Sequence, residues 1–300
     1  MNRVPVRIER TPILPDSPQR RVPILRDVAA LRATVAGWRA RGRSVALTPT
    51  MGALHAGHIS LVKLAKTKVD NVVMSIFVNP AQFAANEDFG AYPRTFAADV
   101  ELFVAAGGDA IFAPPVEAMY GEGFSTTLQA GGPALAGLED RFRPTHFSGV
   151  ATVVAKLLNQ CRPDVAIFGE KDFQQLLVIA RMARDLDFES EIIGAPTVRE
   201  KDGLALSSRN IYLASEARKA APALYAALVR CASALRGGAA MEQAVAAARA
   251  SVEAAGFAID YVEARHAETL APVASIAEGP VRLLAAARLG GTRLIDNIAV

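Results

Sequence analysis

The chain has little cysteine: only Cys161 and Cys231 occur, and they form no Cys-x-x-Cys pair. This usage excludes a disulfide framework, and a reducing cytoplasm is the compartment that we expect. The chain also has no uninterrupted apolar stretch of the roughly 18 residues that a membrane span needs. Residues 1–20 lack the apolar core of a secretory signal, and we interpret residues 1–21 as a mobile extension ahead of the fold.

Charge of one sign is not in large excess, because 33 basic residues stand against 30 acidic ones and leave a net charge of +3. No dense run of lysine and arginine with interleaved aromatic residues is present. The composition therefore does not predict a nucleic-acid-binding protein. The chain also lacks a Walker A pattern, a Gly-x-Gly-x-x-Gly turn and a Gly-x-Ser-x-Gly elbow. These absences argue against a P-loop protein and a dinucleotide-binding fold.

What the chain does have is a hydrophobic fraction of 51%, arranged as short apolar runs between longer amphipathic ones. The apolar runs predict strands at 45–47, 72–78, 110–112, 165–168 and 191–193. The amphipathic stretches predict helices at 26–41, 59–69, 96–106, 149–161 and 173–187. Continuous Val/Ile/Phe strands separated by helices imply a parallel sheet that is covered on both faces. We therefore expect residues 22–196 to form an α/β, Rossmann-like doubly wound domain.

The pattern changes after Pro196. Residues 197–213 are polar and irregular, and residues 215–256 are rich in alanine and typical of helix, with a break at Gly237-Gly238. Short strand-like runs follow at 259–264, 281–287 and 292–298. We therefore expect residues 197–300 to form a second, smaller α+β domain at the C-terminal end.

The most informative stretch is 48–58, TPTMGALHAGH, which lies between a predicted strand and a predicted helix. A glycine-containing turn that enters a helix favours an anion, because the helix N-terminus has free N–H groups and a partial positive charge. His55 and His58 lie three residues apart, so both rings can face the same bound group. Gly52 and Gly57 leave room for a ligand to approach the backbone. The stretch therefore predicts a site for nucleotide phosphates.

Two other interpretations of this histidine pair stay open. A His-x-x-His pair can bind zinc, but zinc needs at least one more ligand, and only His146 and His266 and the distant cysteines remain. Alternatively, the histidines only cap the helix and face solvent. The glycines and the Thr-Pro-Thr-Met turn make a phosphate site the preferred interpretation, with no metal ligands assigned.

Polar clusters also follow other predicted strands, at the edge where open parallel sheets bind ligands. Asn79 and Gln82 offer amide groups for hydroxyls or carboxylates, although an ordinary Asn-Pro turn would account for them as well. The segment 169–175, GEKDFQQ, puts a lysine at a helix N-terminus, which indicates either a bound phosphate or a capped helix with a solvated lysine. Asp172 is placed to cap that helix or to accept from ribose hydroxyls.

Two further clusters are suited to an anion. Ser207, Ser208 and Arg209 put two hydroxyls and a guanidinium in one loop beyond the expected domain boundary, where they could grip a polyphosphate. An ordinary serine-rich loop would need no such explanation. Arg143 precedes the helix predicted at 149–161 and could supply a further contact to an anion.

Taken in order, these segments resemble the pantoate–β-alanine ligase (pantothenate synthetase) family. The matching pieces are PTMGALHAGH at 49–58, FVNPAQF at 77–83, YPRT at 92–95, RPTHFSGV at 143–150, GEKDFQQ at 169–175, PTVRE at 196–200 and DGLALSSRN at 202–210. The resemblance spans residues 22–300. Leu206 and Ala56 depart from it, since the family commonly has methionine and glutamate there.

The resemblance implies the fold of the His-x-Gly-His nucleotidyltransferases. It also implies a ligase that joins (R)-pantoate to β-alanine with ATP and releases AMP and pyrophosphate. The carboxylate of pantoate would first attack the α-phosphorus to give pantoyl adenylate, and the amine of β-alanine would then attack the acyl carbon. Magnesium bound with ATP and a cytoplasmic homodimer are implied as well.

Roles for individual residues follow from the same resemblance. The catalytic residues would be His55, His58, Lys171 and Arg209, with His58 as the proton donor. The residues implied to bind ATP are Met51, Gly52, Ala53, Leu54, His55, Ala56, Gly57, His58, Gly169, Glu170, Lys171, Asp172, Val198, Leu206, Ser207, Ser208 and Arg209. Those expected to bind the other substrates are Gln82, Gln175, Asn79 and Arg143.

Two alternative functions remain to be weighed. A nucleotidyltransferase that stops at an adenylated or cytidylylated product would have no use for the motifs of Gln82 and Gln175. A binding module that senses a nucleotide would have no use for leaving-group contacts at Lys171 and Arg209. Both residue pairs therefore favour the ligase.

Overall fold

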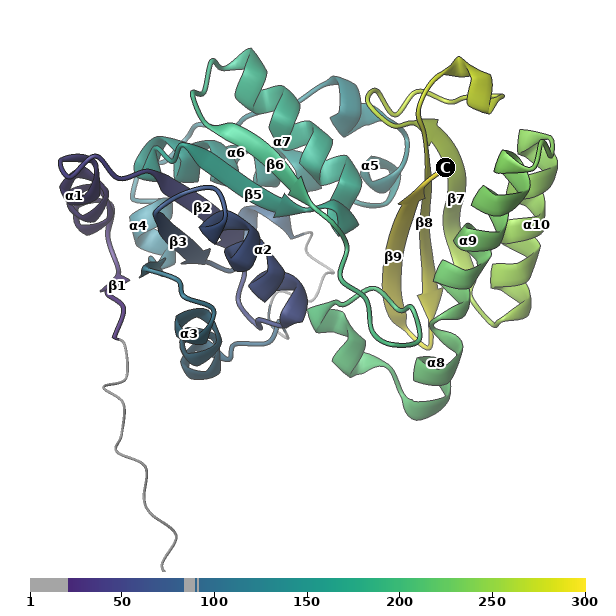
Figure 1. Cartoon of the computed structure of the whole chain (residues 1–300), viewed down its shortest axis with the longest axis horizontal. Helices are drawn as coiled ribbons and strands as arrows, with labels where there is room; N and C mark the ends of the chain where they lie inside the picture. Colours follow the sequence, from purple (N-terminus) through teal and green to yellow (C-terminus); the bar gives the residue numbers. More distant parts are fainter. Residues whose placement is uncertain (1–20, 84–89, 91) are drawn as a thin grey trace, which may run out of the picture.

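The computed structural model describes residues 21–83, 90 and 92–300, so residues 1–20 of the expected extension lie outside the described residues. A larger N-terminal part is built on a six-stranded sheet, and a smaller C-terminal part is built on a three-stranded sheet (Figure 1). Within the described ranges, no helix is long and apolar enough to cross a membrane.

The larger sheet has the strand order β1-β4-β3-β2-β5-β6, and all of its pairs are parallel. Its strands are β1 Ile24–Leu25, β2 Val45–Thr50, β3 Asn71–Ile76, β4 Ala110–Phe112, β5 Val165–Gly169 and β6 Glu191–Ala195. From β2 the chain winds outward through β3 and β4, and it then crosses to the other side for β5 and β6. The switch point between β2 and β5 is where such sheets bind ligands. The expected doubly wound, Rossmann-like sheet is confirmed.

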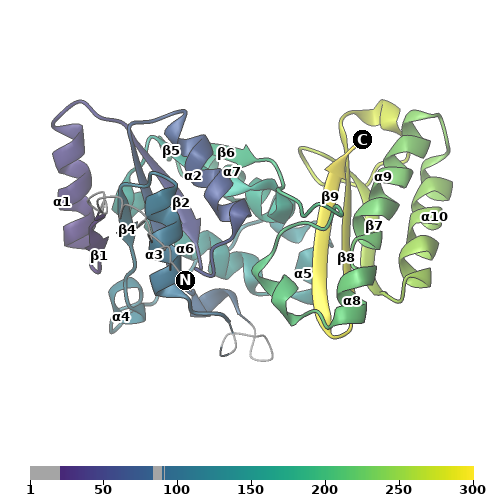
Figure 2. The same cartoon turned by 60° about the horizontal axis from the view of Figure 1, so that its bottom comes forward.

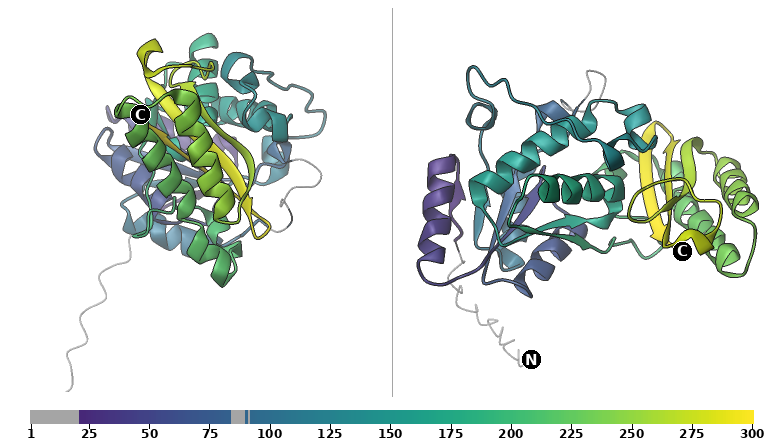
Figure 3. Two further views of the ribbon diagram at one scale, coloured as in Figure 1. Left: turned by 90° about the vertical axis from the view of Figure 1, so that its right-hand side faces the viewer. Right: turned by 90° about the horizontal axis from the view of Figure 1, so that it is seen from above.

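Helices cover both faces of this sheet (Figure 3). The helices α1 Val28–Arg39, α6 His146–Cys161 and α7 Phe173–Asp185 share one apolar core, whereas α2 Ala56–Lys66 and α3 Phe96–Ala105 share the other. Within β2, Val45 and Leu47 belong to the first core and Ala46 to the second. Burial on both faces explains why these strands are continuous apolar runs without polar alternation.

Several boundaries differ from those that the pattern predicts. The pattern does not predict β1, α4 Val116–Met119 or α5 Glu139–Phe142, because each is too short to show a hydrophobic period. The helix predicted from Gly149 begins earlier, at His146. The strand predicted at 45–47 continues to Thr50, whose hydroxyl donates to the carbonyl of Ser75 on the neighbouring strand at 2.7 Å.

The C-terminal part has the helices α8 Ser215–Ala220, α9 Ala223–Arg236 and α10 Met241–Ala254 and the strands β7 Ala258–His266, β8 Val281–Leu289 and β9 Thr292–Ala299. The strands form an antiparallel sheet that α9 and α10 cover on one face, while the other face turns toward the N-terminal part (Figure 2). The predicted break at Gly237-Gly238 separates α9 from α10. The smaller α+β domain is confirmed, and we propose its boundary near residue 196, because β6 ends at Ala195 and the second core begins at Leu204.

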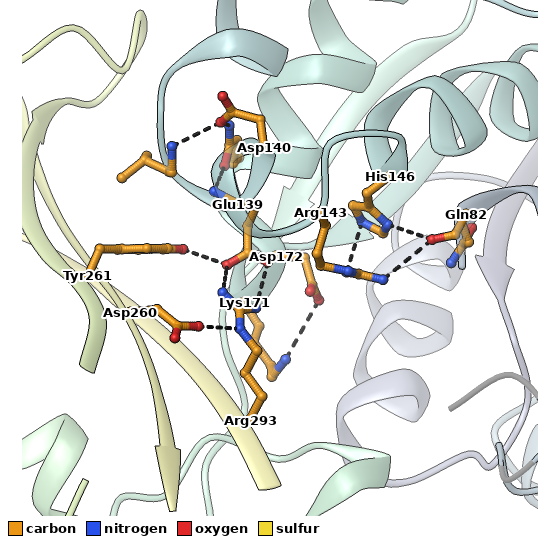
Figure 4. Close-up of polar contacts among 12 residues, drawn as sticks. Gln82, Glu139, Asp140, Arg143, His146, Lys171, Asp172, Asp260, Tyr261 and Arg293 are labelled. Carbon is orange, nitrogen blue, oxygen red and sulfur yellow. Dashed lines mark hydrogen bonds and ion pairs between the residues drawn. The ribbon is translucent and has the colours of Figure 1, made fainter. Parts of the chain in front are cut away.

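Buried ion pairs join the two parts (Figure 4). Arg293 of β9 donates to both carboxylate oxygens of Glu139 on α5, at 2.7 and 2.9 Å, and to Asp260 of β7 at 2.6 Å. The hydroxyl of Tyr261 donates to the same Glu139 carboxylate at 2.7 Å. Burial alone would raise the pKa of Glu139, but the bonds and charge of Arg293 bring it below its usual value. The small sheet is therefore held against the larger part by charged groups whose partners are all in place.

Candidate active site

A cavity of about 230 Å³ opens beyond the carboxyl ends of β2, β3 and β5. A second cavity of about 600 Å³ lies between the two parts, and Arg143, Lys171 and Arg209 line both. The predicted site residues that line the smaller cavity are Met51, His55, Gly57, His58, Asn79, Gln82, Arg143, Gly169, Lys171, Asp172, Gln175, Val198, Leu206, Ser207, Ser208 and Arg209. The predicted residues that do not line it are Gly52, Ala53, Leu54, Ala56 and Glu170.

The two histidines sit at the start of α2 and cap it reciprocally. His55 is the N-cap residue, and its Nδ1 accepts from the backbone N–H of Gly57 at 3.1 Å. His58 lies in the first turn, and its Nδ1 accepts from the backbone N–H of His55 at 3.3 Å. The ring centroids are 4.2 Å apart. The capping and phosphate interpretations are therefore not exclusive, because the rings that cap the helix also line the cavity.

This capping determines which nitrogen of each ring carries the proton. Each Nδ1 accepts from the backbone, so a neutral ring carries its hydrogen on Nε2 and can donate it. Burial lowers the pKa of His58 to about 3, with smaller contributions from His55 and Lys171. Burial, followed by the charge of Lys171, lowers the pKa of His55 to about 4. At neutral pH the pair therefore offers two N–H donors and no positive charge.

Behind the histidines, the turn at Gly52–Leu54 is anchored by a residue that sequence reasoning missed. The carboxylate of Asp99, which is buried, accepts from the backbone N–H groups of Ala53 at 3.0 Å and Leu54 at 2.8 Å. Gly52 has φ +87°, and a Cβ there would lie 3.0 Å from that carboxylate, so the position requires glycine. No motif signals Asp99, because it lies on α3 and reaches the turn only in the folded chain.

The turn after β5 brings Lys171 to the cavity. The Lys171 Nζ is 3.8 Å from a carboxylate oxygen of Asp172. The Asp172 side chain makes no capping bond to α7, so that expected role is wrong: the carboxylate pairs with the lysine and lines the cavity instead. Asn297 of β9 donates to the backbone carbonyls of Glu170 and Lys171, both at 2.9 Å. The Glu170 carboxylate accepts from Arg282 at 3.0 Å, which accounts for its absence from the cavity wall.

The serine loop, residues 207–212, reaches the cavity from the C-terminal side. The Ser207 hydroxyl accepts from the backbone N–H of Arg209 at 3.2 Å and begins the 3₁₀ turn Ser208–Tyr212. At the base of the loop, Arg199 pairs with both oxygens of Asp296 on β9, at 2.6 and 2.8 Å. Asp296 and Asn297 of β9 therefore anchor the base of the serine loop and the lysine turn, respectively.

Gln82 lies at the other side of the cavity and is held through its amide and its backbone. Its Oε1 accepts from Asn79 at 3.2 Å, and its Nε2 is 3.0 Å from the sulfur of Met51. Arg143, His146 and the Gln82 carbonyl form a triangle of polar contacts (Figure 4). Since a guanidinium can only donate, His146 Nε2 accepts from Arg143 at 3.2 Å, and His146 Nδ1 donates to the Gln82 carbonyl at 3.1 Å. His146 belongs to the motif RPTHFSGV and is a possible metal ligand by its residue type, but the sequence does not predict this contact with Gln82.

No metal-binding cluster accompanies these groups. Throughout residues 21–83, 90 and 92–300, no three His, Cys, Asp or Glu side chains are placed to hold an ion together. Cys161 and Cys231 are free and buried, and burial raises the pKa of Cys161 to about 12. The smaller cavity is lined by N–H and O–H donors, cationic side chains, amide groups and the carboxylate of Asp172.

Comparisons with known proteins show the family to which the chain belongs. The family model for pantoate-beta-alanine ligase matches residues 23–299. Pantothenate synthetase of Rhodopseudomonas palustris strain HaA2 is 60% identical over 277 residues, which cover 92% of this chain and 98% of that protein. The crystal structure of pantothenate synthetase from Thermus thermophilus is similar with a TM-score of 0.88 and 46% identity, over 92% of this chain and 99% of that one.

A further similar structure, with a TM-score of 0.76 and 30% identity, is the pantoate-beta-alanine ligase of Francisella tularensis complexed with Beta-gamma ATP and Beta-alanine. It covers 93% of this chain and 98% of its own. Both the match to the family model and the identity to the Rhodopseudomonas protein extend over nearly the whole chain. The chain therefore belongs to the pantoate-beta-alanine ligase family.

Proposed function

We propose that this ligase condenses (R)-pantoate with β-alanine in two half-reactions that pass through a pantoyl adenylate formed from ATP. The observation that carries the proposal is the convergence of two kinds of side chain on one cavity. Donors and cations suited to phosphates come from His55, His58, Lys171 and Arg209, and amides suited to hydroxyls come from Gln82 and Gln175. The Francisella relative, complexed with Beta-gamma ATP and Beta-alanine, supports the choice of nucleotide and amine.

In the first half-reaction, a carboxylate oxygen of pantoate attacks the α-phosphorus of ATP. A new P–O bond forms, the bond to the bridging oxygen breaks, and pyrophosphate leaves with the electron pair. Lys171 and Arg209 stabilise the charge that builds on the leaving group, together with the hydroxyls of Ser207 and Ser208. No side chain forms a covalent bond, so catalysis consists of positioning and electrostatic stabilisation.

His55 and His58 contribute as neutral donors in this scheme. Each directs an Nε2–H to a phosphate oxygen, because its Nδ1 is occupied by the helix N-terminus. Without nucleotide, burial holds the pKa of His58 at about 3, so the ring meets ATP in its neutral form. We therefore propose a hydrogen-bonding role for His58, and the proton-donor role that the family resemblance implies stays a prediction.

In the second half-reaction, the amine of β-alanine attacks the acyl carbon of the adenylate. The C–N bond forms, the C–O bond to the phosphate breaks, AMP leaves, and the nitrogen loses its proton to solvent. Gln82, Gln175 and Asn79 hold or orient the pantoyl group in both steps. Arg143 lines both cavities, so we assign it to the carboxylate of β-alanine arriving from the larger one.

The nucleoside end of ATP would lie along Met51, Gly169, Val198 and Leu206, with Asp172 accepting from ribose. Gly57 leaves room for the phosphates, while Gly52, Ala53, Leu54, Ala56 and Glu170 shape the site from behind the cavity wall. Magnesium usually binds one or two carboxylates together with substrate phosphates. Asp172 supplies the one carboxylate among the described residues that line the smaller cavity, so most ligands of a magnesium ion there would have to come from the ATP phosphates. We therefore propose that Mg²⁺ binds together with ATP and neutralises part of the phosphate charge.

The resemblance to the family further supports a cytoplasmic homodimer. Two free, buried thiols are compatible with a reducing compartment. Light scattering after size exclusion measures the oligomer directly: a mass twice that of the 31.7 kDa chain is the expected result, and a monomer would contradict it.

A substrate-omission assay tests the function. Purified protein with ATP and Mg²⁺ is expected to release pyrophosphate only when pantoate is present, and AMP at steady state only when β-alanine is added as well. Turnover of ATP that is indifferent to pantoate would overturn the ligase assignment. A stable adenylate that β-alanine does not discharge would instead indicate a nucleotidyltransferase.

A further inference from the structure

Tyr120 lies outside every segment assigned to the site, yet its hydroxyl reaches the group that holds Gln82. It follows the short helix α4 and donates to Asn79 Oδ1 at 2.7 Å. The other hydrogen bonds of the Asn79 side chain are longer: 3.3 Å from the backbone N–H of Ala81, 3.2 Å to the carbonyl of Gly149 and 3.2 Å to Gln82 Oε1. The phenol therefore makes the shortest bond of this buried amide, which is 1% exposed.

The orientation of both amides follows from backbone groups with only one possible role. The N–H of Ala81 can only donate, so the end of Asn79 that faces it is the oxygen. The carbonyl of Gly149 can only accept, so the other end is the nitrogen. Tyr120 must then donate to Asn79, and Asn79 must donate to Gln82 Oε1. The Gln82 Nε2 is left as the end beside Met51 that can donate to a ligand in the cavity.

The ring of Tyr120 is held in place independently of its hydroxyl. It lies 6.1 Å from the ring of Phe77 and 5.0 Å from that of Phe124, and the Lys156 ammonium is 5.9 Å from its centre. Burial raises the pKa of Tyr120 to about 12, so the phenol keeps its proton over the pH range in which the enzyme can be assayed. Removal of the hydroxyl alone should therefore leave the aromatic packing in place.

The backbone beneath the Tyr120–Asn79–Gln82 hydrogen bonds is also held in place. A Cβ on Gly149 would lie 2.2 Å from the carbonyl oxygen of Ala81 and 2.7 Å from the Cα of Gln82, so α6 packs directly on the backbone of the turn Pro80–Gln82. The Gln82 backbone therefore has little freedom to compensate for a change in its side-chain partners. The Tyr120 hydroxyl fixes the orientation of the Asn79 amide, and through it that of the Gln82 amide.

We propose that Tyr120 is a positioning residue for pantoate, which acts through Asn79 to keep the Gln82 Nε2–H directed at the substrate. This inference rests on the proposed function, in which Gln82 binds pantoate. Without the phenol, the Asn79 amide keeps only long hydrogen bonds, and Gln82 gains rotational freedom that pantoate binding must remove. The effect should fall on pantoate and spare ATP, whose contacts lie on other segments.

Steady-state kinetics of Tyr120→Phe test the proposal. Because one neutral hydrogen bond is removed, KM for pantoate is expected to rise about 3- to 10-fold, with KM for ATP within about twofold of wild type. Tyr261→Phe is the matched control, since it also removes a phenol bond of 2.7 Å, to Glu139, and it should leave KM for pantoate unchanged. Equal rises in both KM values, or an unchanged KM for pantoate, would overturn the role of Tyr120.

A double-mutant cycle shows whether the effect passes through Asn79. In an Asn79→Ala background, Tyr120→Phe should change KM for pantoate no further, whereas additive effects would contradict the relay. Melting curves of every variant show that it is folded at the assay temperature. The wild-type enzyme separates the two hypotheses. If it releases no pyrophosphate in response to pantoate, the proposed function fails. If it does, and KM for pantoate is the same in Tyr120→Phe as in wild type, only the positioning role fails.

Discussion

The histidine loop and the interface between the two parts of the molecule are built in opposite ways. The bonds that fix His55 and His58 join residues two or three positions apart, whereas Arg293 and Glu139 are 154 positions apart. The first arrangement is a helix cap whose rings also line the cavity; the second is a buried ionic cluster whose members come from both domains. Changes in the loop should therefore reduce activity with little loss of stability, and changes at the interface should do the reverse.

The largest effect is expected at the interface. Arg293→Met leaves the buried Glu139 carboxylate and the partly buried Asp260 carboxylate without their cation, so the free energy of unfolding should fall by about 3–5 kcal/mol. Urea unfolding measures the change. The control is Arg249→Met, at an exposed position on α10, which should cost less than about 0.5 kcal/mol. Equal stability of the two variants would mean that the ionic cluster does not hold the domains together.

Next in size is the loss of a phosphate donor from the histidine loop. His58→Ala should lower kcat about 10²- to 10³-fold, the range seen when one preorganised donor to a developing charge is removed. The lost cap should cost only about 1 kcal/mol of stability. His266→Ala, at the far end of β7, serves as the control with normal turnover expected. Near-normal turnover of the His58 variant would show that His58 does not take part in catalysis.

A smaller loss of activity is expected at Lys171, which lines the cavity and is also held by a contact from the small domain. Its side chain lines the cavity, but its backbone carbonyl is held by Asn297 of the small domain. Lys171→Ala should slow pyrophosphate release about 10- to 100-fold, consistent with the loss of a charge-assisted hydrogen bond. Discharge of pantoyl adenylate that is supplied to the enzyme should change less. If rapid-quench measurements found the second step slowed more than the first, Lys171 would not act on the leaving group.

The histidine loop should also make the stability of the protein depend on pH. Unfolded histidines have a pKa near 6.5, whereas in the folded protein the pKa is about 4 for His55 and about 3 for His58. Because the unfolded state binds protons first, the stabilisation is fully present above about pH 6.5 and is lost as the pH falls toward the folded values. Between pH 7 and pH 5, the free energy of unfolding should therefore fall more steeply for the wild-type protein than for a His55→Gln, His58→Gln double variant. Parallel curves would show that the rings are not held neutral.

Local patterns account for what could be predicted from the sequence. The strand cores around Leu47, Val73 and Ile167 stand out because burial on both faces produces unbroken apolar runs. The stretch 48–58 stands out because histidine, glycine and the first helical turn interact within a few residues. Of the two roles considered for Asp172, the capping bond to α7 is not formed, and the carboxylate lies 3.8 Å from the ammonium of the preceding residue, Lys171.

The residues that sequence reasoning missed all act across long separations. Asp99 reaches the backbone of Ala53 from 46 positions away, His146 reaches the Gln82 carbonyl from 64, and Tyr120 reaches Asn79 from 41. None belongs to a periodic pattern that would distinguish it from ordinary helix or turn residues. Their contacts exist only once the sheet has brought α3, α4 and α6 to the same edge.

The alternation of strands and helices follows from the amino-acid order alone, because propensity, capping and hydrophobic period are properties of neighbouring residues. The family follows from motifs that are equally local, and the same motifs predict the residues that we propose to bind phosphate and pantoate. How those groups are presented depends on the folded arrangement. Folding left the Nε2 of each histidine ring free to donate, turned Glu170 away to Arg282, and put the Gln82 amide under the control of Asn79 and Tyr120. The reason is physical: burial and hydrogen-bond partners set a proton's position and an amide's orientation, and two of these partners, Tyr120 for Asn79 and Arg282 for Glu170, are distant in the chain.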